Sequence, residues 1–101
     1  MAVIHLTKAN FDSTIGEGKC LVDFWASWCG PCKMLAPTIE ALSEIYDGSV
    51  KVCKVDIDAE PELANRFGVM SIPTVIAFEN GEQKDKIVGV QPQSAFESLL
   101  A

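Results

Sequence analysis

The sequence has few positive charges and no long hydrophobic run. Eight lysine and arginine residues stand against fourteen aspartate and glutamate residues, which gives a formal net charge of −6 at pH 7. This imbalance leaves no basic surface for phosphates, so nucleic acid is not an expected partner. No apolar run approaches the roughly 18–20 residues that span a bilayer, so no membrane partner is expected either.

The first residues also lack the basic segment and long apolar segment of a secretory signal peptide. We therefore expect a reducing compartment, with the cytoplasm as the default and an organelle reached by a removed transit peptide as the alternative. A chain of 101 residues, 49% of them hydrophobic, is long enough for one domain with its own core. We expect a single domain over residues 1–101 that works as a monomer. Four cysteines in a reducing setting favour metal binding or catalysis over structural cross-links.

The hydrophobic pattern alternates predicted strands with predicted helices. Nearly continuous apolar runs predict buried strands, and the Asn80-Gly81 pair predicts a hairpin turn. The predicted strands are 3–6, 20–26, 50–55, 74–78 and 84–88. The predicted helices are one capped by Thr7 that runs to Ile15, 32–46, 59–67 capped by Asp58, and 92–100. The order β-α-β-α-β-α-β-β-α predicts an α/β fold with a mixed five-stranded central sheet and helices on both faces.

The long predicted helix 32–46 has a distinctive composition. Pro37 lies inside it and is expected to kink it. Its predicted core-facing stripe consists of Met34, Leu35, Ile39, Leu42 and Ile45.

The most informative segment is Trp28-Cys29-Gly30-Pro31-Cys32, which lies between a predicted strand and this helix. Residues three apart on a helix lie about 5–6 Å from each other, which suits a disulfide. The pair can therefore open and close with little backbone movement. Cys29 falls where the unpaired N–H groups of a helix favour a negative charge, and the thiolate is the form that attacks disulfides.

Half of a zinc site is the alternative interpretation of the pair. Structural zinc usually takes two close ligand pairs, whereas Cys20 and Cys53 are expected to be isolated from each other on predicted strands. The only histidine, His5, is remote in the sequence and is expected to be structural or exposed. We therefore expect no metal, and we expect Cys20 and Cys53 to be buried, reduced and inert.

An ordered set of landmarks resembles the thioredoxin family over essentially the whole chain. They are Val22 to Ala26, the Trp28 to Cys32 motif, Pro37, Lys54, Asp56, Ile72-Pro73-Thr74, Asn80-Gly81 and Gly89. The resemblance implies a thioredoxin fold and a thiol–disulfide oxidoreductase that reduces protein disulfides. In that mechanism Cys29 attacks the substrate disulfide and Cys32 resolves the mixed disulfide. The two cysteines carry the electrons themselves, so no cofactor is expected.

The resemblance also assigns supporting roles around the cysteines. Asp23 interrupts an apolar strand. From the sequence alone, an aspartate at the surface or at the strand end is an equally good explanation. By resemblance it lies beneath Cys32, has a raised pKa and moves that cysteine's proton, with Lys54 nearby. Lys54 is otherwise a solvated charge. Trp25, Gly30 and Pro31 are expected to support the motif.

Substrate binding is likewise assigned by resemblance. The Ile72–Pro73 bond is expected to be trans on general frequencies, but the family has a cis proline at this position, facing the cysteines. Ile72 would then pair with an extended substrate segment. Further substrate contacts are expected from Trp28, Ile57, Val69, Met70, Gly89 and Val90, of which each apolar residue alone would be ordinary packing.

The expected partners also follow from the resemblance. They are a thioredoxin reductase, either NADPH- and flavin-dependent or ferredoxin-linked, and enzymes that regenerate a disulfide at each turnover. Examples are ribonucleotide reductase, peroxiredoxins and methionine sulfoxide reductases. Two other functions stay open at this stage: an oxidase or isomerase of the same fold, and a non-catalytic binding subunit that uses the apolar rim.

Overall fold

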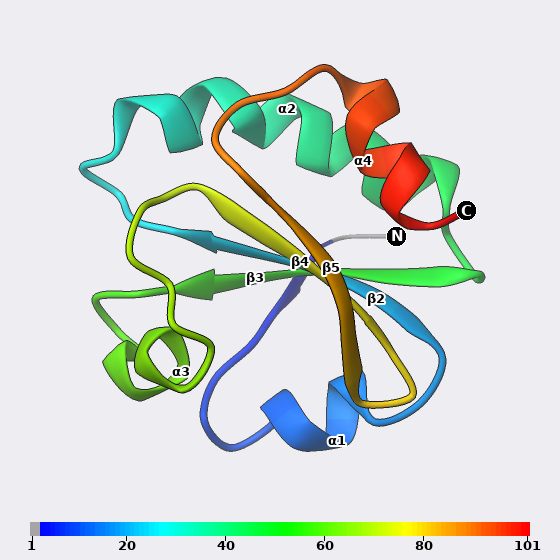
Figure 1. Ribbon diagram of the computed structural model, residues 1–101, viewed down its shortest axis with the longest axis horizontal. Helices are drawn as coiled ribbons and strands as arrows, with labels where there is room; N and C mark the ends of the chain where they lie inside the picture. The colour runs from blue at the N-terminus through cyan, green and yellow to red at the C-terminus, as the bar shows by residue number, and fades with distance from the viewer. Residues whose placement is uncertain (1–2) are drawn as a thin grey trace.

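The computed structural model describes residues 3–101 as a central sheet between two layers of helices (Figure 1). Along the chain its elements are β1 (Ile4–His5), α1 (Phe11–Ile15), β2 (Lys19–Trp25), α2 (Gly30–Ile45), β3 (Val50–Asp56), α3 (Pro61–Arg66), β4 (Thr74–Glu79), β5 (Glu82–Val88) and α4 (Gln93–Leu99). This order confirms the predicted succession of strands and helices.

The five-stranded sheet has the order β1-β3-β2-β4-β5. β3 pairs in parallel with both β1 and β2, whereas β4 pairs antiparallel with β2 and β5. The sheet is therefore mixed, as predicted. β2 and β4 are almost entirely buried, which explains their nearly continuous apolar sequences.

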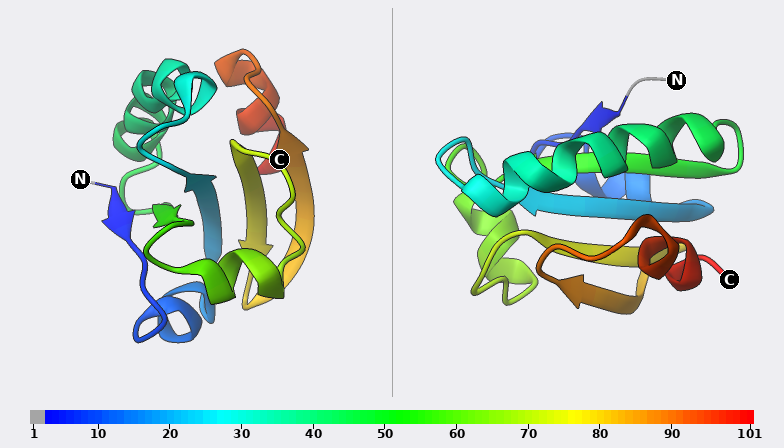
Figure 2. Two further views of the ribbon diagram at one scale, coloured as in Figure 1. Left: turned by 90° about the vertical axis from the view of Figure 1, so that its left-hand side faces the viewer. Right: turned by 90° about the horizontal axis from the view of Figure 1, so that it is seen from above.

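Helices cover both faces of the sheet, with α2 and α4 on one face and α1 and α3 on the other (Figures 1 and 2). Alternate residues of a strand point to opposite faces, so β2 supplies two cores. Cys20, Val22 and Phe24 pack in the α1/α3 core, whereas Leu21 packs beneath α2 and α4. Asp23 follows Leu21 by two residues, so the Asp23 side chain points to the same face of the sheet, the one covered by α2.

Two predicted helix starts are wrong. Thr7 does not cap α1, because residues 7–10 form a turn in which the Thr7 N–H donates to Asn10 Oδ1 at 2.6 Å and the Thr7 carbonyl accepts the Asn10 N–H. The N-cap is Asn10. Asp58 does not cap α3, which begins at Pro61 after Glu60.

The predicted stripe of α2 is partly wrong. Leu35, Ile39 and Leu42 are buried in the core, but 71% of Met34 and 57% of Ile45 is exposed. Each residue turns the helix by about 100°, so Met34 lies beside the stripe rather than on it. Pro37 lies inside α2, as predicted.

The β4–β5 turn depends on two residues with positive φ, Asn80 at 51° and Gly81 at 84°. This confirms the predicted Asn-Gly hairpin. The Asn80 side chain also accepts the Gly18 N–H at 2.9 Å, which ties the turn to the loop before β2.

We predict that Gly81→Ala lowers the free energy of unfolding by about 1 kcal/mol, because a Cβ disfavours the left-handed conformation. Urea denaturation provides the measurement. Gly81→Asn is the matched control and should cost less, since asparagine tolerates positive φ. Equal losses for the two variants would contradict this explanation.

Candidate redox site

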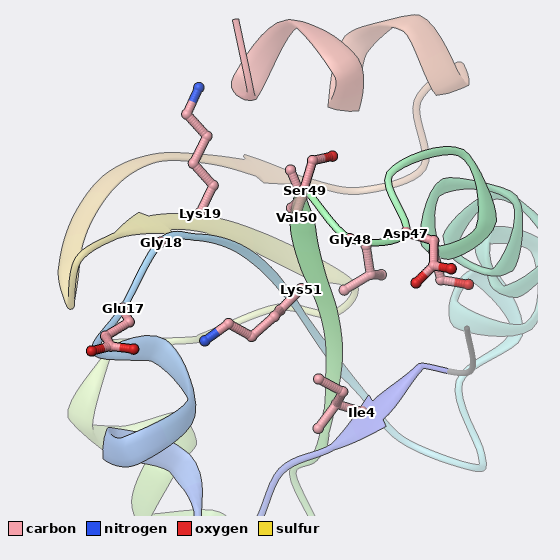
Figure 3. Close-up of a pocket in the computed structure, with 11 residues that line it drawn as sticks. Ile4, Glu17, Gly18, Lys19, Asp47, Gly48, Ser49, Val50 and Lys51 are labelled. Atoms are coloured by element: carbon pink, nitrogen blue, oxygen red, sulfur yellow. The ribbon is translucent and has the colours of Figure 1, made fainter.

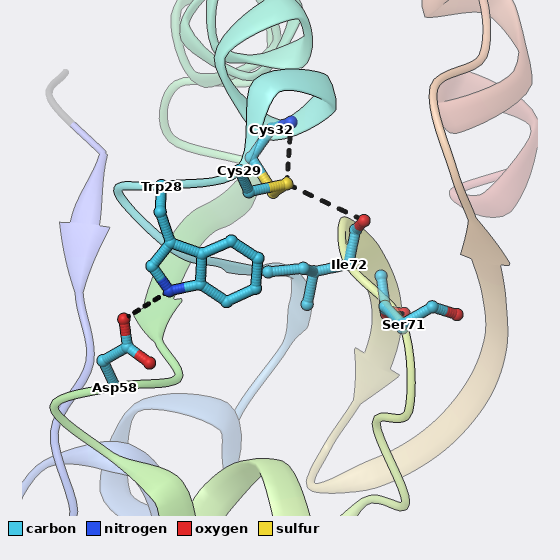
Figure 4. The surroundings of a disulfide bond; sticks show 7 residues. Trp28, Cys29, Cys32, Asp58, Ser71 and Ile72 are labelled. Carbon is cyan, nitrogen blue, oxygen red and sulfur yellow. Dashed lines mark hydrogen bonds between the residues drawn. A yellow bond between two sulfur atoms is a disulfide. The ribbon is translucent and has the colours of Figure 1, made fainter.

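The two motif cysteines meet at the N-terminus of α2, where they form a disulfide (Figure 4). Their Cα atoms lie 5.3 Å apart, as predicted for residues three apart at a helix start. Cys29 is the N-cap of α2, and its Sγ accepts the Cys32 backbone N–H at 3.2 Å. The amino end of a 16-residue helix therefore faces this sulfur and stabilises negative charge on it.

A pocket of about 400 Å³ opens beside this disulfide. It is lined by Trp28, Cys29, Gly30, Pro31, Ile57, Val69, Met70, Ser71 and Ile72. We call it the redox groove. Cys29 lines the groove and Cys32 does not, so an incoming molecule reaches the first sulfur from this side. Val90 does not line it, although 40% of this residue is exposed.

The Ile72–Pro73 peptide bond is cis, as the resemblance implies. The carbonyl oxygen of Ile72 lies 3.8 Å from Cys29 Sγ (Figure 4). Gly89, with a φ of 98°, donates its N–H to the Pro73 carbonyl at 2.8 Å. The α2 start and the Ile72 segment, which are distant in the sequence, thus meet at the groove, and the residue after β5 is hydrogen-bonded to the neighbouring Pro73.

Asp58 is a site residue that the sequence analysis missed. Its Oδ2 accepts the indole N–H of Trp28 at 2.8 Å, which fixes one wall of the groove (Figure 4). The Asp56 side chain in turn accepts the Asp58 N–H at 2.9 Å. Asp58 and Trp28 are thirty residues apart, so no local sequence pattern could have indicated their contact.

Asp23 is a buried carboxyl, 1% exposed, and neither oxygen accepts a hydrogen bond from the described residues. Burial raises its pKa to about 6, against the opposing attraction of Lys54. Lys54 is its register partner on β3, and the Lys54 ammonium lies 5.0 Å from the centre of the Trp25 ring. The strand pairing therefore brings Asp23, Lys54 and Trp25 together.

Trp25 also packs against the small cluster formed by Ala26, Cys29 and Cys32. Asp23 therefore lies two residues from a side chain that packs against the cluster containing the redox cysteines. This arrangement places a carboxyl that titrates near neutral pH in the strand leading to the site.

Cys20 and Cys53 are buried and are not bonded to each other. Their predicted isolation is wrong, because β2 and β3 are neighbours and both thiols lie in the α1/α3 core. Burial raises the pKa of each thiol, that of Cys53 to about 12. Residues 3–101 contain no group of three or more potential metal ligands.

A second pocket, of about 390 Å³, lies at the opposite end of the sheet (Figure 3). The starts of β2 and β3 and the loop after α2 line it, with Lys19, Gly48 and Lys51 among its residues. Both lysine ammonium groups donate to backbone carbonyls, Lys19 to that of Leu100 and Lys51 to that of Thr14. The pocket holds no cysteine, so the redox groove is the candidate site.

Comparison with known proteins agrees with this geometry. The family model described as Thioredoxin matches residues 2–101. The chain belongs to the thioredoxin family. It is 54% identical over 100 residues to the thioredoxin of Staphylococcus saprophyticus, 51% to that of Staphylococcus haemolyticus and 48% to that of Staphylococcus aureus. In each case the match covers 99% of this chain and 96% of the relative.

Family membership accounts for the disulfide. Thioredoxins are disulfide reductases that use a redox-active cysteine pair in place of an external cofactor, and they work with thioredoxin reductase and disulfide substrates. The Cys29–Cys32 disulfide is the redox-active pair of this chain. None of the helices within residues 3–101 has the length and hydropathy needed to cross a membrane.

Proposed function

We propose that this chain is a general protein-disulfide reductase in which Cys29 is the attacking residue and Cys32 the resolving residue. The observation that carries the assignment is the asymmetry of the pair. Cys29 lines the groove and caps α2, whereas Cys32 lies inside the first turn and is absent from the groove wall. The sulfur at the helix terminus is the better-stabilised thiolate and the one that belongs to the groove wall.

The reaction proceeds by two thiol–disulfide exchanges. The Cys29 thiolate forms a bond to one sulfur of the substrate disulfide, and the other substrate sulfur leaves as a thiolate that takes up a proton. Cys32 then loses its proton and attacks Cys29 Sγ, which releases the second substrate thiolate. Two electrons pass to the substrate, and the Cys29–Cys32 disulfide is formed.

Asp23 is the proposed acceptor of the Cys32 proton. Its pKa of about 6 lies close to neutral pH, so the carboxyl can both take up and release a proton under working conditions. Lys54 favours the ionised form of Asp23 and limits the rise in its pKa. Trp25 holds the Lys54 ammonium over its ring and supports the two cysteines.

The redox groove is the proposed binding site for an extended segment of the substrate. Trp28, Ile57, Met70 and Ile72 would make apolar contacts, with Gly89 and Val90 at the outer edge. The Ile72 carbonyl lies beside the reactive sulfur and would pair with the substrate backbone. Gly30 and Pro31 line the groove and Pro73 follows Ile72 through the cis bond, and none of the three is proposed to react.

The proposed electron source is a thioredoxin reductase, either NADPH- and flavin-dependent or ferredoxin-linked. Ribonucleotide reductase, peroxiredoxins and methionine sulfoxide reductases are proposed recipients. We further propose that the chain acts in the cytoplasm as a monomer and as one domain, without a bound metal or cofactor.

A stoichiometric reaction with a model protein disulfide tests this function. The pre-reduced protein, freed of small thiols, should reduce one insulin disulfide for each Cys29–Cys32 disulfide that forms, as measured by mass spectrometry of both proteins. An oxidase or isomerase is distinguished by its less negative reduction potential. Failure to transfer electrons to any protein disulfide would leave only the non-catalytic binding function.

A further inference from the structure

Met70 stands at the edge of the redox groove with 95% of its surface exposed. It lies two residues before Ile72, whose carbonyl is 3.8 Å from Cys29 Sγ. A substrate segment seated beside the reactive sulfur would therefore cover the Met70 thioether. The inference below rests on the proposed function, in which protein substrates bind in the redox groove.

Competing sulfur targets are protected when the chain is in its disulfide form. Cys29 and Cys32 are bonded to each other, and Cys20 and Cys53 are buried. Burial raises the pKa of both buried thiols, so few thiolates are present at neutral pH. Thiolate character and exposure govern oxidation by peroxides, so the exposed thioethers become the reactive sulfurs.

We propose that Met70 is a modification site for hydroperoxides and that its sulfoxide weakens the binding of protein substrates to the redox groove. In this reaction the peroxide O–O bond breaks and one oxygen bonds to the methionine sulfur. The thioether loses two electrons, and the peroxide is reduced to water or to an alcohol. A sulfoxide reductase would reverse the change by returning two electrons and releasing the oxygen as water.

The effect on binding follows from the change in polarity. The thioether is flexible and apolar, and it adapts to varied substrate side chains. The sulfoxide is polar and chiral, so an apolar substrate that covers it removes a hydrated oxygen from water without replacing its hydrogen bonds. The redox chemistry at Cys29 is untouched, so the loss should appear in KM.

Met34 provides a matched control on the same molecule. It is 71% exposed on α2 and does not line the groove. Peroxide should therefore oxidise both methionines, but only the sulfoxide at Met70 should affect protein substrates. Peptide mapping by mass spectrometry separates these products from oxidation of Met1.

The experiment treats the disulfide form with hydrogen peroxide, removes the oxidant, and assays the wild type, Met34→Leu and Met70→Leu. We expect kcat/KM for insulin reduction to fall about three- to tenfold in wild type and Met34→Leu. Met70→Leu should keep its own untreated value. Reduction of a small aromatic disulfide, which does not cover Met70, should be unchanged in all three.

Three results would overturn the proposal. The first two are mapped Met70 sulfoxide with an unchanged kcat/KM and an equal loss of kcat/KM in Met70→Leu. Peroxide that oxidises Met34 and leaves Met70 intact would overturn it as well. The untreated wild-type rate separates these outcomes from failure of the proposed function. An untreated protein that reduces no insulin contradicts the reductase assignment, whatever the peptide map shows.

Discussion

Replacing Cys29 with serine is expected to abolish reduction of protein disulfides, with a loss of about 10³-fold or more. A hydroxyl at the N-cap can still accept the Cys32 N–H, so the helix start should be preserved. It cannot form a thiolate or a disulfide, however. The measurement is insulin reduction with dithiothreitol as electron source. Cys20→Ala is the control: it removes a buried thiol from the α1/α3 core and should stay active.

Cys32→Ser tests the resolving role by a different readout. The first exchange should proceed and the second should not, so the mixed disulfide with Cys29 should accumulate as a covalent complex in non-reducing gels. A complex that forms through Cys32 in Cys29→Ser, and not through Cys29 in Cys32→Ser, would reverse the proposed roles.

Asp23→Asn is expected to stabilise the fold strongly at neutral pH. The folded-state pKa of about 6 exceeds the ordinary value of 3.8 by about two units, and each unit corresponds to about 1.4 kcal/mol. The folded protein therefore holds this proton more tightly than the unfolded chain. The wild type loses stability as pH rises from about 4 to about 6, and the penalty stays at about 3 kcal/mol above that range.

The neutral amide of the variant avoids this penalty. The gain in the free energy of unfolding should therefore be close to zero below pH 4 and should reach about 3 kcal/mol at pH 7 to 8. Urea denaturation across this pH range is the measurement. Asp85→Asn, on the exposed strand β5, controls for the loss of one negative charge. A gain that does not change with pH would show that burial of a charged carboxylate is not its cause.

The same variant tests the proton transfer. If Asp23 accepts the Cys32 proton, Asp23→Asn should slow resolution of the mixed disulfide and remove an inflection near pH 6 from the rate profile. An unchanged profile in a variant with the expected gain in stability would restrict Asp23 to a structural effect.

Local sequence patterns predicted the element order because each pattern reflects short-range physics. The Asn80-Gly81 turn needs two residues that tolerate positive φ, and the apolar run of β2 needs burial on both faces. The predicted helix starts at Thr7 and Asp58 were wrong, and the cause is also a short-range interaction. Side-chain hydrogen bonds of Asn10 and Asp56 stabilise turns there, and several polar residues in each segment were capable of capping.

The sequence by itself determined the cysteine spacing, the presence of a helix after it and the succession of strands, because these depend on neighbours along the chain. The predicted start of that helix, Cys32, lies two residues after the observed start at Gly30. Only the tertiary structure decided that Asp23 is buried opposite Lys54, that Cys20 and Cys53 share one core, and that Asp58 holds Trp28 at the groove. Those outcomes depend on which strands pair and on what covers them. Contacts between residues about thirty positions apart form only when the chain folds, and the local hydrophobic pattern of the sequence does not indicate them.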